Sequence, residues 1–405
     1  MALNRRSFIA AGAATLVATR AYSAPAIKIG VLTDLAGPYA DDSGQGSILS
    51  AKLAIEDFRK LNGGFDVELI SGDFQTKPDI AASRAAAWYD TDGVDLVIDV
   101  PVSSAALAVA TIAKEKNKVA IFNAGTSALT GKSCGPNHAQ WSFDTYALAA
   151  TTGRAVVAAG GKSWFFIQAN YAFGASLVAD ATSVIEKSGG RVLGTVKYPF
   201  PETSDFASFL LQAQSSGADV IGFASAGADS TNLIKQASEF GLANGKAKLA
   251  TLLCFIPQIH ALGLGAAQGL QVSEAFYWDL NEGTRQLAAR YSPQLGGAKP
   301  CTIQAGCYSG VFHYLKAVAA LGVDRAKKDG AAVVAKMKDI PTDDLAFGKG
   351  RLREDGRKIH DMYLFEVKKP GESSQPWDYY KHVSTVAGEQ AFRPIAEGHC
   401  DLVHT

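Results

Sequence analysis

Short, nearly continuous apolar segments alternate along this chain with longer segments of helical periodicity, and this alternation constrains the fold more than any other feature. Such apolar runs are typical of strands that are buried on both faces of a parallel sheet. Candidate strands fall at 27–32, 67–70, 96–100, 119–122, 164–168, 192–198, 220–223 and 249–254. Candidate helices fall between them, at 47–59, 79–89, 104–116, 145–159, 175–187, 206–214 and 230–240. The series predicts an α/β fold with right-handed crossovers.

The alternating series divides into two halves, which predicts two lobes. One half ends near Trp141, and a second runs to about Ser273. Later segments follow without a linker that would mark a third domain: strands at 271–277, 350–353 and 362–367, and helices at 284–291, 303–321 and 331–338. We therefore distribute these late segments over both lobes. Lobe 1 is assigned residues 24–143 and 274–348, and lobe 2 is assigned residues 144–273 and 349–405, with a C-terminal segment that returns toward lobe 1.

The first residues have the order of an export signal. Arg5 and Arg6 precede an apolar stretch at 9–18, and small residues around Ser23 offer a cleavage site. This order predicts a signal peptide at residues 1–23 and a mature protein outside the cytoplasm. The arginine pair favours the twin-arginine route, and an ordinary secretory signal remains the alternative. A membrane anchor is disfavoured because the apolar stretch is short for a transmembrane span.

Charge and cysteine content exclude several classes of protein. The 405 residues include 39 basic and 39 acidic ones, and this balance argues against a nucleic-acid partner or an anionic membrane surface. The five cysteines match no zinc pattern. Outside the cytoplasm disulfides form, and we favour Cys134 with Cys400 because both lie in loops rich in Gly and Pro. Cys254 and Cys307 lie in apolar runs typical of a core, and pairings that include Cys301 stay open.

Five segments, taken in order, resemble a known family. They are 27–40, the serine loop at 101–105, the loop at 123–130, the aromatic-Gly turn at 170–174 and the late hairpin at 348–367. Together they resemble the type I periplasmic solute-binding proteins of ABC transporters, in particular the leucine/isoleucine/valine-binding branch. The resemblance implies two Rossmann-like lobes joined by three hinge crossovers. It also implies a monomer without a cofactor that closes on its ligand like a Venus flytrap, in the periplasm, and delivers it to an ABC permease in the inner membrane.

The resemblance places the ligand in the cleft between the lobes, beyond the carboxyl ends of the strands. Ser103 or Ser104 can cap the helix that follows, and the free N–H groups at that helix start suit a carboxylate. The other candidate contacts are the backbone at Ala124, Gly125 and Thr126, the turn residues Tyr171 and Phe173, and the aromatic side chains Tyr39, Phe255 and Trp278.

Departures from the family pattern point to the ligand. Amino-acid binders of this branch hold the ligand's ammonium with a glutamate after the strand read here as 249–254, whereas this chain has Phe255 and no acid there. A family tyrosine is also missing from the loop at 225–228. An ammonium buried without an acceptor is costly. We therefore expect a small carboxylate without an amine, either an aromatic acid or a keto acid. An amino-acid ligand stays open if Asp279 supplies the acid, and so does a role as a ligand-sensing partner of a receptor.

Catalytic and cofactor sites are not indicated. The segment from Gly125 to Ser133 resembles a phosphate-binding loop, but its first glycine is out of place by one residue and Pro136 follows where a helix should start. None of the seven histidines forms a metal pair at helical spacing. We expect no enzymatic activity, no metal and no cofactor.

Overall fold

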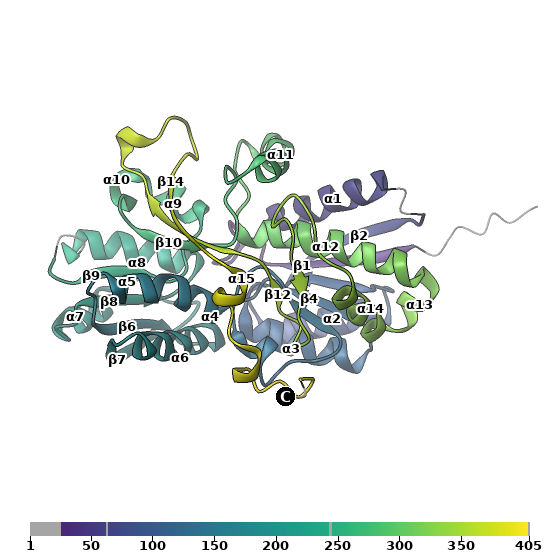
Figure 1. Ribbon diagram of the computed structural model, residues 1–405, viewed down its shortest axis with the longest axis horizontal. Coiled ribbons are helices and arrows are strands. Elements are labelled where there is room, and N and C mark those ends of the chain that lie inside the picture. The colour runs from purple at the N-terminus through teal and green to yellow at the C-terminus, as the bar shows by residue number, and fades with distance from the viewer. Residues whose placement is uncertain (1–25, 62–63, 243–244, 404–405) are drawn as a thin grey trace, which may run out of the picture.

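The computed structural model describes residues 26–61, 64–242 and 245–403. The predicted signal peptide lies outside the described residues. Figure 1 shows two α/β lobes side by side, with several segments crossing between them. The fold class is therefore confirmed, and each lobe has its own parallel sheet with helices on its faces.

Lobe 1 is built on a parallel five-stranded sheet in the order β2-β1-β3-β4-β5. Its strands are β1 (Ile27–Thr33), β2 (Val67–Asp73), β3 (Leu96–Asp99), β4 (Val119–Phe122) and β5 (His138–Gln140). Its helices are α1 (Gly44–Lys60), α2 (Pro78–Asp90), α3 (Ser103–Glu115), α11 (Glu282–Tyr291), α12 (Thr302–Leu321), α13 (Val323–Lys328) and α14 (Gly330–Asp339). Every residue of β3 and β4 is buried, as expected for central strands covered on both faces.

Lobe 2 contains a parallel four-stranded sheet in the order β7-β6-β8-β9. Its strands are β6 (Ser163–Ala169), β7 (Arg191–Tyr198), β8 (Val220–Ala224) and β9 (Lys248–Thr251). Its helical elements are α4 (Thr145–Leu148), the π-helical turn η2 (Ala149–Gly153), α5 (Arg154–Ala158), α6 (Ala172–Lys187), α7 (Ala207–Ser215), α8 (Gly227–Glu239), α9 (Ile256–Leu262) and α10 (Leu264–Ala267). An antiparallel sheet of β10 (Gln271–Glu274), β13 (Met362–Val367) and β14 (Tyr380–Val386) completes the strands that cross between the lobes.

A buried arginine joins two of the crossing segments. The Arg357 guanidinium donates to the backbone oxygens of Trp141 and Phe143 and lies 3.7 Å from a carboxylate oxygen of Asp144. Burial lowers the pKa of Arg357 to about 10, and the Asp144 charge opposes that shift. Because Arg357 also forms a parallel bridge with Gln140 beside β5, the short hairpin of β11 (Arg351–Leu352) and β12 (Lys358–Ile359) lies against lobe 1. The sequence assigned this hairpin to lobe 2, and the other lobe boundaries stay a prediction.

The C-terminal segment is tied to lobe 1 by a disulfide between Cys134 and Cys400, which confirms the favoured pairing. The Arg393 guanidinium adds a 2.9 Å hydrogen bond to the backbone oxygen of Ser127. The other three cysteines are free and buried, in agreement with the core positions expected for Cys254 and Cys307.

Some predicted ends were wrong for identifiable reasons. The strand expected at 249–254 ends at Thr251, because the chain turns there to start α9, with Pro257 in its first turn. The strand expected at 271–277 ends at Glu274, where the antiparallel pairing with β13 stops. Strands β5, β12 and β14 were missed because they are short or mostly exposed and lack a continuous apolar run.

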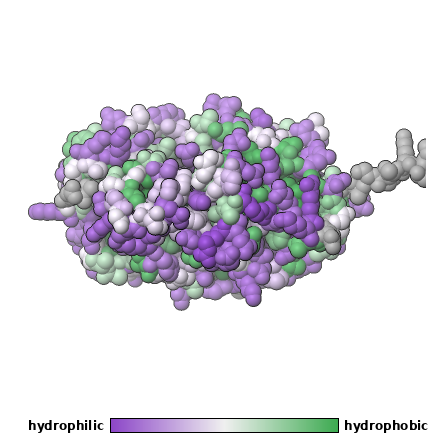
Figure 2. All heavy atoms as spheres, turned by 90° about the horizontal axis from the view of Figure 1, so that it is seen from above, coloured by the Kyte–Doolittle hydropathy of each residue, from purple (hydrophilic) through white to green (hydrophobic). Residues whose placement is uncertain are grey.

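The surface shows no large apolar face from the side seen in Figure 2, where small hydrophobic patches lie among hydrophilic residues. Among the described residues, no helix has the length and apolar content that crossing a bilayer requires.

Candidate ligand-binding site

The two lobes touch each other through loops at the carboxyl ends of their strands. The hydroxyl of Tyr39, after β1, is hydrogen-bonded to the hydroxyl of Tyr171, after β6. Nearby, the backbone N–H of Ala228 donates to the backbone oxygen of Pro38 at 3.0 Å. The structure is therefore a closed form, and the predicted site residues Tyr39 and Tyr171 meet across the cleft.

Gly227 permits this close approach of the lobes. It stands at the start of α8 with φ of +57°, and a Cβ atom there would lie 2.2 Å from the Pro38 oxygen. Backbone atoms cannot yield to such a clash, and φ in this range already disfavours side chains. The lobe contact thus depends on a residue without a side chain.

The helix α3, which follows the serine loop at 101–105, begins without the serine cap that the sequence predicts. The N-cap of α3 is Val102, and no side chain caps this helix, so neither Ser103 nor Ser104 has the capping role that we expected. The reason is that the Ser103 Oγ is engaged elsewhere: it accepts a 3.1 Å hydrogen bond from the backbone N–H of Thr126. Ser103 is fully buried, whereas Ser104, one residue into the helix, is partly exposed. The uncapped helix start therefore presents Ser104 and unused backbone N–H groups.

The predicted loop at 124–126 is fixed by internal hydrogen bonds. Gln140 Nε2 donates to the backbone oxygens of Ala124 at 2.7 Å and Thr126 at 3.0 Å. The Gly125 oxygen accepts from the backbone N–H of Thr145 at 2.7 Å. These bonds use the carbonyl groups of the loop, and Ser103 occupies the Thr126 N–H. The loop is thus a rigid wall, and ligand contact by its backbone stays a prediction.

Aromatic side chains from both lobes gather around Gly125. A Cβ on Gly125 would lie 2.6 Å from the Phe173 ring of lobe 2. Phe255 meets Phe143 edge to face, with ring centroids 5.5 Å apart, and Tyr171 stacks on Phe200 at 4.2 Å. The predicted contact residues Tyr39, Phe173 and Phe255 thus belong to one group of touching aromatic rings, together with Tyr171, Phe143 and Phe200. Contact of this aromatic wall with a ligand stays a prediction.

Trp278 has different partners. Its indole N–H donates to the backbone oxygen of Trp377 at 2.7 Å, and the Lys299 ammonium lies 4.5 Å from the ring centroid. None of these partners belongs to the aromatic group around Gly125. The structure therefore places Trp278 against the loop that precedes β14, and a ligand contact from it stays a prediction.

The acid considered in the sequence, Asp279, is not directed into the cleft. It pairs with Arg285 at 3.2 Å, and both side chains are well exposed. A lobe-2 acid that does lie at the cleft is Asp229, in the first turn of α8, which is buried beside the Tyr198 hydroxyl. Burial raises the pKa of Asp229 to about 6, and the Tyr198 hydroxyl opposes that shift.

A second buried acid links the lobes on the hinge side. Gln258 Nε2 of α9 donates to the Asp42 carboxylate at 2.7 Å. Burial raises the pKa of Asp42 to about 7, while the Gln258 hydrogen bond lowers it and the Asp41 charge raises it. Glu274 at the end of β10 is buried close by and accepts from the hydroxyls of Thr302 and Tyr380. Burial raises its pKa to about 8.

The sequence analysis missed Asp42, Phe143, Tyr198, Phe200 and Asp229. For Tyr198, Phe200 and Asp229, their position relative to the predicted strands could have indicated the site. Tyr198 and Phe200 lie at the carboxyl end of β7. Asp229 lies one residue beyond the loop at 225–228, in which a tyrosine was sought. Both positions are at the edge of the sheet where ligands bind in open α/β folds. Asp42 gave no such signal, because its partner Gln258 is 216 residues away in the sequence.

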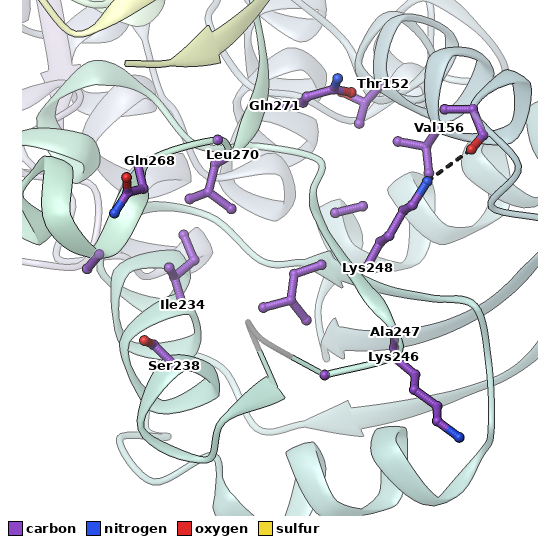
Figure 3. A pocket seen from close by; sticks show the side chains of 16 residues that line it. Thr152, Val156, Ile234, Ser238, Lys246, Ala247, Lys248, Gln268, Leu270 and Gln271 are labelled. Atoms are coloured by element: carbon purple, nitrogen blue, oxygen red, sulfur yellow. Dashed lines mark hydrogen bonds between the residues drawn. The ribbon is translucent and has the colours of Figure 1, made fainter. Parts of the chain in front are cut away.

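A separate cavity of about 430 Å³ lies in lobe 2 (Figure 3). Its lining comes from η2, α5, the later part of α8 and the segments that lead into β9 and β10. The Lys248 ammonium is held by a 3.0 Å hydrogen bond to the backbone oxygen of Ala159. The cavity thus lies at the amino ends of the strands, away from the lobe interface, and contains none of the predicted site residues. Among the described residues, no group of side chains is arranged to bind a metal ion.

Comparisons with known proteins agree with this geometry. The family model described as "Periplasmic binding protein" matches residues 26–372. A periplasmic binding protein from Burkholderia mallei is 46% identical, with a TM-score of 0.88, and the alignment covers 93% of this chain and 99% of that chain. A branched chain amino acid ABC transporter periplasmic ligand-binding protein from Burkholderia xenovorans LB400 is 38% identical, with a TM-score of 0.81 and coverage of 93% and 99%.

More distant structures share the fold alone. A solute-binding protein of an ABC transporter from R. palustris, solved in complex with 4-hydroxybenzoate, is 22% identical, with a TM-score of 0.80 and coverage of 90% of this chain and 98% of that chain. Among curated proteins, none matches this sequence significantly.

Protonation of Asp42 is expected to favour closure of the lobes. In an open form Asp42 would be solvated, with a pKa near the usual value of about 4. The closed form, with its pKa of about 7, therefore takes up a proton as the pH falls below about 7. The ratio of closed to open molecules should rise by up to about tenfold for each unit that the pH falls from about 7 to about 4, and this gain should be lost as the pH rises again to about 7. Small-angle X-ray scattering should give a smaller radius of gyration at acidic than at alkaline pH.

The variant Asp42→Asn, which mimics the protonated side chain, should stay compact at alkaline pH and show a weaker pH dependence. Asp92→Asn is the control, because Asp92 is exposed and should leave the wild-type profile unchanged. A wild-type radius of gyration that does not change with pH would contradict the assignment.

Proposed function

Because the chain belongs to the periplasmic binding protein family, the solute-binding components of ABC transporters, we propose that it captures a small carboxylate without an amine in the cleft between its lobes. An aromatic acid is the favoured ligand. The observation that carries this proposal is the uncapped start of α3, where Ser104 lies partly exposed beside an aromatic wall from both lobes. A permease in the inner membrane receives the ligand, and export with cleavage after Ser23 delivers the protein to the periplasm.

The α3 start supplies the carboxylate end of the site. Backbone N–H groups of a first helical turn have no partner within the helix, and the helix dipole adds positive potential there. Such a terminus contributes on the order of 0.3–2 kcal/mol, whereas micromolar affinity needs roughly 8 kcal/mol. The remainder comes from the Ser104 hydroxyl and from burial of the ligand as the lobes close. Ser103 serves a different purpose, because it braces the loop at Thr126.

The aromatic wall supplies the apolar part of the site. Phe143, Phe173 and Phe255 are each almost completely buried in the closed form. Flat rings that pack edge to face suit an aromatic ligand, since ring pairs add about 0.5–1.5 kcal/mol beyond the area they bury. The loop between β9 and α9 contains no acid at all, which supports a ligand without an α-ammonium.

A branched-chain amino acid is the second candidate. The relative from Burkholderia xenovorans LB400, 38% identical over nearly the whole chain, is named for a branched chain amino acid transporter. Such a ligand would use the same α3 start for its carboxylate and would need an acceptor for its ammonium. The two proposed ligand classes therefore predict binding of different carboxylic acids, and one titration series distinguishes them.

A thermal-shift and calorimetric series tests the ligand class. The mature chain from Ala24 onward is titrated with benzoate, phenylpyruvate and leucine, and a ligand at about 100 times its Kd should add roughly 2.7 kcal/mol to stability. We expect stabilisation by benzoate and not by leucine. Ser104→Ala should weaken benzoate binding roughly 10- to 150-fold, because one hydrogen bond to a charged group is lost. Ser83→Ala, at an exposed position on α2, is the control. Stabilisation by leucine alone would overturn the proposal in favour of the second candidate.

Closure around the ligand is tested at Gly227. Gly227→Ala should weaken ligand binding at least tenfold, because its Cβ would meet the Pro38 oxygen only when the lobes are closed. Gly217→Ala is a matched control: it has a similar φ of +66° in the same lobe, but nothing lies within 4 Å of its Cβ position. Both variants should lose about 1 kcal/mol of stability from the positive φ, measured by urea unfolding. Equal affinities for the two variants would show that closure at Pro38 is not needed for binding.

A further inference from the structure

The Asp229 carboxylate is a buried acid with unused hydrogen-bonding capacity at the lobe interface. The residue is 4% exposed, and its Oδ2 atom has no hydrogen-bond partner among the described residues. The Tyr198 hydroxyl, which lies next to this carboxylate, is likewise buried and without a partner that meets hydrogen-bond geometry there. Native proteins leave few buried polar atoms unpaired, and each exception calls for an explanation.

Three tyrosine hydroxyls lie close enough to this acid for its charge to act on them, and they come from both lobes. Tyr39 belongs to lobe 1, and Tyr171 and Tyr198 end or follow strands of lobe 2. Burial is the main reason that the pKa of each tyrosine is raised, and the Asp229 charge contributes to the shift in all three. We call these four residues the tyrosine–aspartate cluster. It lies on the cleft because Tyr39 and Tyr171 touch across it.

The cluster is separated from the α3 start by aromatic rings. Phe173 packs against Gly125, near the α3 start, and the Tyr171 ring follows at a centroid distance of 6.0 Å from Phe173. The Tyr171 hydroxyl then reaches the cluster. The two polar ends of the cleft are thus separated by two aromatic side chains. An α-ammonium, bonded to the carbon next to the carboxylate, is too close to that carboxylate to reach Asp229.

A phenolic hydroxyl matches the unused atoms of the cluster. Its O–H donates to the Asp229 carboxylate, and its oxygen accepts from the Tyr198 hydroxyl, so that both unpaired groups gain a partner. Burial raises the pKa of Asp229 to about 6, so the carboxylate is largely ionised at neutral pH and accepts a strong, charge-assisted hydrogen bond.

We propose that Asp229 and Tyr198 form a second polar subsite, which binds a hydroxyl group on the ring of an aromatic acid at the end opposite to its carboxylate. The inference rests on the proposed function, since it assumes that the carboxylate occupies the α3 start. It makes Asp229 a specificity-determining residue that separates hydroxylated from unsubstituted aromatic acids.

Isothermal titration of the mature chain with 4-hydroxybenzoate, benzoate and 4-methoxybenzoate tests the subsite. The wild type should bind 4-hydroxybenzoate at least about tenfold more tightly than the other two acids, because a site built for a hydroxyl rejects analogues that lack its donor. Asp229→Ala should weaken 4-hydroxybenzoate binding about 10- to 100-fold and change benzoate binding less than about threefold. Tyr198→Phe, which keeps the ring, should reduce the preference by a smaller factor.

Controls separate the subsite from a general loss of structure. Asp180, another acid near the lobe contact, bonds to Thr145 and not to the cluster, so Asp180→Asn should change the affinity for all three acids by the same factor. If Asp229→Ala fails to fold, Asp229→Asn and Tyr198→Phe carry the same comparison. Equal wild-type affinity for benzoate and 4-hydroxybenzoate, or a preference that survives Asp229→Ala, would overturn the subsite alone. Failure of every aromatic acid to bind, with leucine bound instead, would overturn the proposed function itself.

Discussion

The contact between the start of α8 and the loop after β1 is the constraint on which the rest of the closed structure depends. Gly227 brings the two backbones together without a side chain between them, and the Ala228 N–H bonds to the Pro38 oxygen. This contact places Tyr39 against Tyr171 and buries Asp229 behind them. The loops of the two lobes then face each other across one interface, as in other hinge-closing proteins.

The proposed ligand site has a polar end, an apolar middle and a second polar end. The α3 start offers N–H groups and Ser104, the rings of Phe143, Phe173 and Phe255 form the middle, and the tyrosine–aspartate cluster forms the far end. Polar groups at fixed positions within an apolar pocket orient a ligand and give specificity. Asp42 and Gln258 lie at a different place on the lobe interface. There the burial of Asp42, which raises its pKa, is expected to connect closure to protonation.

The sequence predicted the fold well because the apolar runs are a direct consequence of burial on both faces of each sheet. The runs at 119–122 and 362–367 coincide with β4 and β13, and the Cys134–Cys400 disulfide followed from loop composition. The site was predicted less completely. Ser103 was interpreted as a cap, but its bond to Thr126 depends on a neighbouring loop that local sequence does not describe. Trp278 was expected to contact the ligand, and local sequence could not show its observed partner Trp377, which lies 99 residues away. Asp229 was overlooked because only the spatial convergence of β7, β8 and the loop after β1 shows that it is an acid of the cleft.

The most direct test of this account is a crystal structure of the mature chain bound to 4-hydroxybenzoate. We expect the carboxylate to lie at the start of α3, within hydrogen-bond distance of Ser104. The phenolic oxygen should lie between Asp229 and Tyr198, with the lobes closed at Gly227. A ligand bound in the reverse orientation, or bound outside the cleft with the lobes apart, would contradict it.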